Sequence, residues 1–271
     1  MRSLLAALLG LAAALVGLFA VPTAWIAHNV SSEDGYVALT EPLVSDAALQ
    51  DAVAAYVAET LVDRGRLPES LQGPATTALT AAARQAGSAP GFVEAWSQTQ
   101  ALSHRATFGP DGDGSLRIDL APLAEYLKGH VTGALPVEVG LPDSLPITVG
   151  QADPTIVTQV DEAPDRALLG TVATGVLALG ALVVARRRST ALVWLGVGAL
   201  AVAAVLTAVS HLVVPELIDS TAGVTDVGLT LQHLLVERVA GSLSTWTWMV
   251  AIGGAVAVAV GLLARLVGAR R

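Results

Sequence analysis

The chain has 271 residues, of which 53% are hydrophobic and only 14% are charged, whereas a soluble domain usually has about 25% charged residues. The charges are nearly absent from several long apolar runs, which is typical of an integral membrane protein. Cysteine is absent, which excludes disulfide bonds and thiolate chemistry, and the net charge of −8 argues against nucleic acid as a partner, because phosphate binding needs clustered Lys and Arg.

Four apolar runs are each long enough to cross a hydrocarbon core about 30 Å thick. They predict transmembrane helices at residues 1–27, 166–186, 190–214 and 246–267, and the bilayer as a partner. The first run is longer than the apolar core of a signal peptide, which favours an uncleaved signal anchor over a cleaved signal. Pro215 is expected to end the third run, because proline removes a helix hydrogen bond.

Arginine marks one end of each run. The arginines concerned are Arg2, Arg186, Arg187, Arg188, Arg265, Arg270 and Arg271. Arginine near a membrane end is retained on the cytoplasmic side. We therefore expect a multi-pass protein of the cell membrane, with both ends of the chain and the turn at 186–190 in the cytoplasm. Segments 28–165 and 215–245 are then extracytoplasmic.

Segment 28–165 carries 19 acidic and six basic residues, a net charge of −13, and is long enough for one domain with its own core. Apolar residues at helical spacing predict helices at about 46–62, capped by Ser45 or Asp46, at 69–85, interrupted early by Gly73 and Pro74, at 90–106 and at 121–131. Alternating stretches predict short strands at 115–120, 137–139, 146–149 and 155–160. The predicted fold class is a membrane α-helical protein with four transmembrane helices and a mostly helical, extracytoplasmic α+β domain.

The later loop, 215–245, contains apolar residues that predict an amphipathic helix at about 225–240. Two positions are open for this helix, one on the membrane surface and one against the extracytoplasmic domain. The net charge of this loop is weakly acidic, so electrostatic attraction is a weak explanation for a position on the membrane surface.

Tryptophan and small residues predict how the helices sit and pack. Indole favours the membrane interface, so we expect Trp25, Trp246 and Trp248 at the outer interface and Trp194 at the inner one.

Small residues four apart share a helix face and permit close helix packing. Three such sets predict a compact helix bundle or, alternatively, a homo-oligomer. They are Gly253, Ala257 and Gly261; Ala199, Ala203 and Thr207; and Ala167, Thr171 and Gly175.

No catalytic, cofactor-binding or metal-ligating residue is predicted. The run from Asp111 to Gly114 opens like a calcium loop, but Leu116 and Pro122 occupy the positions that need Gly and a bidentate Glu. The histidines, which lack metal-binding spacing, are His28, His104, His130, His211 and His233. A metal or proton site at His28, His211 and Glu216 is the alternative to plain interfacial polarity. His104 is expected at or near the surface of its helix.

A resemblance rests on YVALTEPLVSDAALQDAV at 36–53, FVEAW at 92–96 with His104, LRIDL at 116–120 and PITV at 146–149. In these stretches the chain resembles a group of uncharacterised integral membrane proteins of high-GC Gram-positive bacteria. The group has one N-terminal anchor, an extracytoplasmic helix-rich domain and further C-terminal transmembrane helices. The resemblance implies localisation and architecture, and it carries no activity or functional residue.

Two functional hypotheses follow. The first is a cell-envelope protein whose acidic extracytoplasmic domain acts non-catalytically, as a scaffold, sensor or regulator of other envelope proteins. The alternative is a membrane enzyme or transport accessory, with its site where that domain meets the outer face of the helix bundle.

Overall fold

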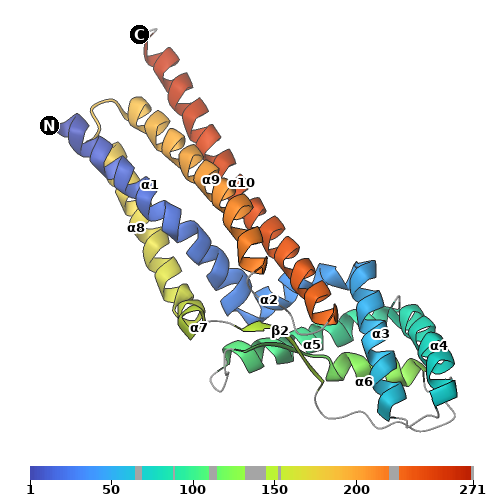
Figure 1. Ribbon diagram of the computed structural model, residues 1–271. Helices are drawn as coiled ribbons and strands as arrows, with labels where there is room; N and C mark the ends of the chain where they lie inside the picture. The colour runs from blue at the N-terminus through green and yellow to red at the C-terminus, as the bar shows by residue number, and fades with distance from the viewer. Residues whose placement is uncertain are drawn as a thin grey trace. The chain divides into compact units, whose positions relative to one another are not determined.

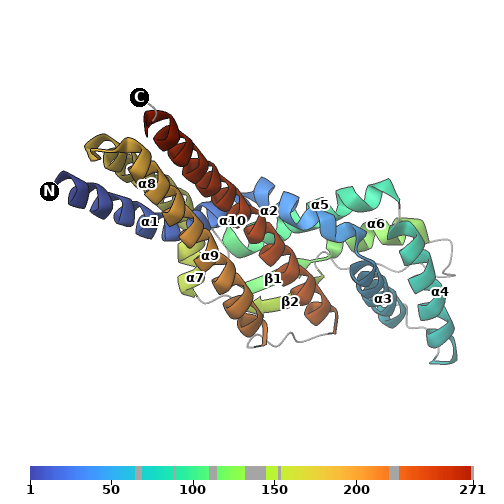
Figure 2. The same cartoon turned by 90° about the horizontal axis from the view of Figure 1, so that it is seen from above.

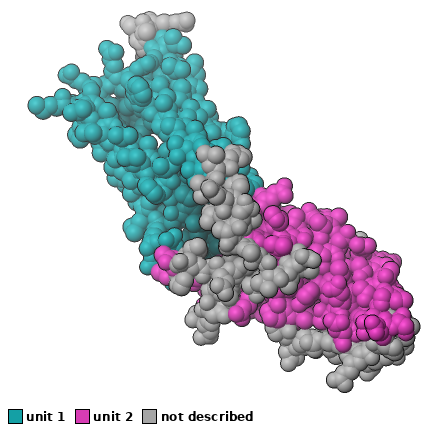
Figure 3. Space-filling view, viewed as in Figure 1, with its two compact units in different colours: residues 1–31, 159–217, 240–271 teal, residues 32–158, 218–239 magenta. Residues whose placement is uncertain are grey.

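The computed structural model describes residues 1–64, 69–87, 89–109, 115–131, 145–151, 154–219 and 226–269. The chain divides into two compact units, which Figure 3 colours separately. Unit 1 comprises Met1–Ser31, Gln159–Leu217 and Ala240–Arg271, and unit 2 comprises Ser32–Thr158 and Ile218–Val239.

Four long helices of the described chain build unit 1, the last of them only from Ala240 onward, and Figures 1 and 2 draw them side by side. They are α1 (Arg2–Ile26), α8 (Ala163–Val184), α9 (Arg188–Asp219) and α10 (Asp226–Ala269). Each contains a stretch that is long and apolar enough to cross a membrane, as the sequence predicts. Large apolar side chains such as Leu168 and Leu263 are exposed on these helices, and lipid solvates such a surface better than water does.

Helix α9 continues through Pro215 to Asp219, beyond the predicted span at 190–214. Proline removes one hydrogen bond, to the carbonyl four residues earlier, and does not by itself end a helix. Helix α1 likewise contains Pro22 and changes only after Ile26 into a π-helical turn, Ala27–Ser31.

Helix α10 joins two elements that the sequence predicts separately. The amphipathic helix at 225–240 and the span at 246–267 form one helix of 44 residues. Between them, Thr245 Oγ1 donates to Gly241 O at 3.2 Å and Thr247 Oγ1 donates to Leu243 O at 2.9 Å. These hydroxyls bond back to carbonyls of their own helix, so their hydrogen-bonding capacity is satisfied without a break in the helix.

Unit 2 begins with α2 (Glu33–Thr40), capped by Ser32, whose hydroxyl accepts from the Gly35 N–H at 3.1 Å. A 3-10 turn, Glu41–Ser45, leads to α3 (Ala47–Arg64). Of the two predicted capping residues, Asp46 caps α3 by accepting from the Ala48 N–H at 2.8 Å.

The next helices confirm their predicted positions. They are α4 (Glu69–Gly87), α5 (Pro90–Phe108) and α6 (Ala121–Val131). The predicted interruption at Gly73 and Pro74 is wrong, because Pro74 lies in the second turn of α4, where it removes a single hydrogen bond.

The two strands of the described chain, β1 (Ser115–Asp119) and β2 (Pro146–Gln151), pair antiparallel, with a register shift between Leu116 and Arg117. Both confirm predicted strands, while the strand expected at 137–139 lies outside the described residues. The strand expected at 155–160 is wrong: these residues form α7 (Pro154–Asp161). Their β-branched side chains favour a strand, but Pro154 is well placed in a first helical turn and tertiary context overrides propensity.

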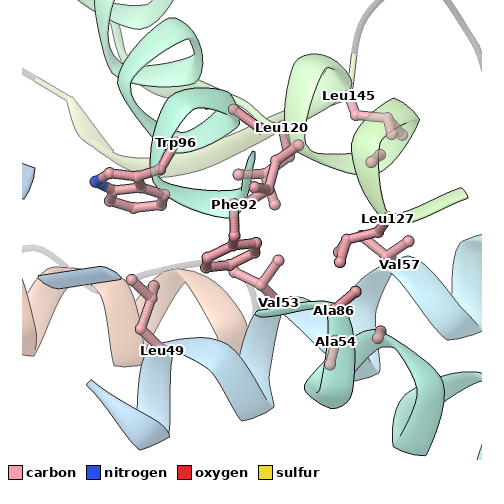
Figure 4. Packing of buried hydrophobic residues seen from close by; sticks show 14 of the residues in the cluster. Leu49, Val53, Ala54, Val57, Ala86, Phe92, Trp96, Leu120, Leu127 and Leu145 are labelled. Atoms are coloured by element: carbon pink, nitrogen blue, oxygen red, sulfur yellow. The ribbon is translucent and has the colours of Figure 1, made fainter. Parts of the chain in front are cut away.

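The core of unit 2 lies between α3, α4, α5, α6 and the sheet. Phe92 of α5 lies between Val53 of α3 and Leu120, beside Trp96 (Figure 4). Burying a side chain of this size contributes about 1.5–3 kcal/mol, so this cluster is the main stabilising element of unit 2.

The start of α10 completes this core. Leu231 is fully buried in the same cluster, and the Arg238 Nε–H donates to Leu39 O at 2.9 Å. Of the two positions that the sequence leaves open for the amphipathic helix, the structure therefore has the one against the domain.

Candidate functional site

Arginines gather at one end of unit 1. Arg186, Arg187 and Arg265 line one cavity together with Ser3. In Figures 1 and 2, the start of α1, the turn between α8 and α9 and the final turns of α10 lie at this end. The helix ends that the sequence assigns to one side of a membrane are thus together in the structure.

The cavity beside these arginines has a volume of about 750 Å³ and lies mainly between α1, α8 and α9. Small apolar residues line much of it, among them Ala6 and Gly10 of α1, Ala181 of α8 and Gly198 of α9. Because these side chains are short, the helix backbones leave space that a row of leucines would fill.

The polar end of the cavity is partly organised by a hydrogen bond. Arg265 Nη2 donates to Thr190 Oγ1 at 2.6 Å, and both residues line the cavity. In the described part of the chain, no carboxylate forms an ion pair with Arg186, Arg187 or Arg265, and none lines the cavity. Trp194, expected at the inner interface, lines the same cavity and is 69% exposed.

The other end of α1 is held by polar contacts within unit 1. The Trp25 Nε1–H donates to Ser242 Oγ at 3.0 Å, and the rings of His28 and Trp246 lie 5.9 Å apart. Trp25 is buried, so its expected role as an interfacial anchor is replaced by a contact between α1 and α10. Trp248 is 67% exposed, and its position at the outer interface stays a prediction.

Helices α9 and α10 approach closely at glycines, but not at the predicted ones alone. A Cβ atom added at Gly196 would lie 2.5 Å from Gly254 O, and one at Gly261 would lie 2.8 Å from Ser189 O. Gly253, in the predicted set, has nothing within 4 Å. The face of α10 that contacts α9 therefore contains Gly254 and Gly261, which are seven residues apart. Gly253 lies on a different face of the helix.

The small-residue sets predicted in the other spans are also mixed. Ala203 and Ala167 are buried, but Gly175 has no neighbour within 4 Å of a Cβ position. The close approach of α8 to α1 occurs instead at Gly170, where an added Cβ would lie 3.0 Å from Ala20 Cβ. Alanine is so frequent in these spans that spacing alone does not select the packed face.

Unit 2 contains a buried polar layer between α2 and α5. The Trp96 Nε1–H donates to Thr40 O at 3.0 Å, and Ser103 Oγ donates to Thr99 O at 2.7 Å while accepting from the Asp119 N–H at 3.0 Å. These bonds use the polar groups for structure: the Ser103 hydroxyl is committed to two backbone partners.

His104 belongs to the same layer, and its expected position at the surface is wrong. It is buried, with its ring 5.3 Å from that of Tyr36 and 5.4 Å from that of Phe108. Desolvation raises the pKa of Tyr36 to about 12, so this phenol is neutral at physiological pH.

Gln100 and Thr99 carry the unpartnered polar atoms of this layer. Both residues are fully buried, and neither the Gln100 amide nor the Thr99 hydroxyl has a hydrogen-bond partner among the described residues. A buried amide without a partner costs free energy, so this position weakens unit 2.

A charged contact lies at the exposed side of the layer. Arg105 Nε and Nη2 donate to the two carboxylate oxygens of Glu33 at 2.7 and 2.8 Å. The hydrogen bonds from Arg105 hold the pKa of Glu33 below its usual value. Glu33 lies in the first turn of α2 and Arg105 in the last turn of α5, where each charge also opposes a helix dipole.

The remaining candidates from the sequence do not assemble a site. Among the described residues, no three His, Asp or Glu side chains gather as metal ligands. His28 and His233 are exposed. The side chains of His130, His211 and Glu216 lie outside those that the structure describes, as does the Asp111–Gly114 run.

Comparison with known proteins gives no match: no protein family, curated protein or solved structure is significantly similar to this chain.

Proposed function

We propose that the chain is a multi-pass cell-membrane protein and that unit 2 is extracytoplasmic, where it acts non-catalytically as a scaffold, sensor or regulator of other envelope proteins. The observation that supports this topology is that Arg186, Arg187 and Arg265 lie together at one end of unit 1. Arginine-rich ends stay in the cytoplasm, so this end is the cytoplasmic one.

The packing of unit 2 supports the non-catalytic role. Ser103 and His104 are the types of residue that hydrolytic enzymes use, yet Ser103 is bonded to two backbone groups and His104 lies between two aromatic rings. A nucleophile or general base must reach a substrate, and these two side chains are buried.

The absence of cysteine permits a direct test of the topology. Single-cysteine variants at Gln85, exposed on α4, and at Arg188, exposed at the start of α9, are treated in intact cells with a membrane-impermeant maleimide. We expect labelling at position 85 in intact cells, and labelling at position 188 only after permeabilisation. The reverse pattern would overturn the proposal.

The role of His104 is tested separately with His104→Phe, which keeps an aromatic ring in the packed layer. A deletion strain complemented by this variant as well as by the natural chain supports a structural histidine. Loss of complementation by a variant that accumulates normally in the membrane would favour an enzyme.

A further inference from the structure

The cavity of unit 1 combines apolar walls with a basic end, and one class of ligand complements both features. Its walls along α1 and α9 are apolar, from Ala6 and Gly10 to Leu195 and Gly198. Its end carries the guanidinium groups of arginines without carboxylate partners in the described chain. An amphiphile with an anionic head matches both.

The volume fits such a ligand. At about 750 Å³, the cavity lies within the range of about 300–1,000 Å³ that is usual for small-molecule sites. Empty apolar space is costly in a packed helix bundle, and in a bilayer the nearest apolar filler is a lipid chain. The small residues that create the space are therefore explained by an occupant.

The polar end selects the charge of the head group. Arginine presents a planar set of donors that binds phosphate in a bidentate manner. Arg265 is already oriented by its hydrogen bond to Thr190, and Arg186 and Arg187 are adjacent in the turn between α8 and α9. Basic pockets between transmembrane helices on the cytoplasmic side favour anionic phospholipids.

We propose that this cavity binds an anionic phospholipid of the surrounding bilayer. Arg186, Arg187 and Arg265 hold the phosphate, and one acyl chain lies along the small residues of α1 and α9, with Trp194 beside it. The inference rests on the membrane insertion that the proposed function includes, and it deepens that function by naming a ligand of unit 1.

Binding is measured on the full chain in neutral detergent by adding phosphatidylglycerol with brominated acyl chains, which quench tryptophan fluorescence at contact. Phosphatidylcholine with the same brominated chains is the comparison, and a Trp194→Phe variant identifies the signal from the cavity. We expect phosphatidylglycerol to bind at least about tenfold more tightly than phosphatidylcholine, with most of the quenching lost in Trp194→Phe. Equal binding of the two lipids would overturn the proposal.

Two variants separate the head-group contacts from general charge. The triple variant Arg186→Gln, Arg187→Gln and Arg265→Gln should lose the preference for phosphatidylglycerol. Arg188→Gln removes a neighbouring arginine that does not line the cavity, and it should keep the preference. Preference that persists in the triple variant, or disappears equally in Arg188→Gln, would contradict the assigned contacts. Helix content from circular dichroism shows that each variant is folded.

A third variant tests the apolar wall. Ala14→Phe fills the cavity from α1 without changing charge, and it should reduce quenching by brominated phosphatidylglycerol. Millimolar inorganic phosphate is added as a competitor. If phosphate displaces the lipid completely, the site binds a free anion. If Ala14→Phe binds lipid as the natural chain does, the acyl chain does not lie in the cavity. Either outcome contradicts the lipid assignment.

The proposed function and the lipid site fail in different ways. A chain that does not insert into vesicles of phosphatidylcholine, with or without phosphatidylglycerol, contradicts the membrane role itself. A chain that inserts into both kinds of vesicle but binds the two lipids equally contradicts the lipid site alone.

Discussion

Units 1 and 2 differ in where their large apolar side chains lie: unit 2 buries many of them, and unit 1 exposes many of them. Unit 2 buries Trp96, Phe92 and Leu127, while unit 1 exposes Leu168, Val176 and Leu263 and buries alanine and glycine. The two units therefore obey different rules for stability. Unit 2 depends on large side chains that exclude water, and unit 1 depends on small ones that let helix backbones meet.

The difference gives opposite expectations for substitution. Shortening a buried side chain should damage unit 2 most, because it leaves a cavity. Enlarging a small residue should damage unit 1 most, because the helices must separate. Four predictions, in order of decreasing effect, test this contrast.

Trp96→Ala should have the largest effect, a loss of about 3–5 kcal/mol in the stability of unit 2. Trp96 is fully buried and its indole N–H bonds to Thr40 O, so the variant loses both packing and a hydrogen bond. The measurement is resistance to proteolysis at rising urea concentration, with cleavage mapped to unit 2.

Trp248→Ala is the matched control, since it removes the same side chain from an exposed position in unit 1. It should leave the resistance of unit 2 unchanged. Equal losses from the two variants would show that burial in unit 2 does not determine its stability.

Gly196→Ala should destabilise unit 1 by about 1–3 kcal/mol, because the added methyl group would meet Gly254 O at 2.5 Å. Thermal unfolding in lipid nanodiscs measures the effect. Gly253→Ala adds the same methyl group beside Gly254, where nothing lies within 4 Å, and should be neutral or slightly stabilising. A neutral Gly196→Ala would contradict the close approach of α9 and α10.

The contrast also explains which parts of the structure could be predicted from sequence. Long apolar runs predict the four helices that are long and apolar enough to cross a membrane, because length and composition define such a helix. Local chemistry was equally informative at Asp46, whose cap begins α3 as expected. Positions that depend on tertiary context were predicted less well.

The face of α10 that contacts α9 illustrates that limit. Spacing of four selects Gly253, Ala257 and Gly261, but it contains no information about which neighbour the helix faces, and the contact follows Gly254 instead. The sequence predicts His104 at the surface for the same reason, because its burial depends on contacts such as that with Tyr36 of another helix. The arginine-ended cavity likewise requires residues from α1, α8, α9 and α10 at once, and no local pattern predicts it.

Gln100→Met should stabilise unit 2 by about 1 kcal/mol, because it replaces a buried amide that lacks a hydrogen-bond partner among the described residues with an apolar chain of similar length. The urea midpoint of proteolysis should rise. Gln98→Met, at an exposed position two residues earlier on α5, is the control and should change little. A fall in the midpoint for Gln100→Met would mean that the amide has a partner in the folded chain.

Glu33→Gln should have the smallest effect, and the effect should depend on pH. Arg105 lowers the pKa of Glu33 in the folded state, so the ion pair stabilises unit 2 above the ordinary glutamate pKa, and this contribution is lost as pH falls through the lowered value. Both side chains are substantially exposed, so solvent screens the pair and the loss is small. The difference in urea midpoint between Glu33→Gln and the natural chain should therefore be present at pH 7 and vanish in acid. Glu59→Gln, exposed on α3, should show no such difference at either pH. A gap that persists in acid would assign the stabilisation to packing around Glu33 and not to its charge.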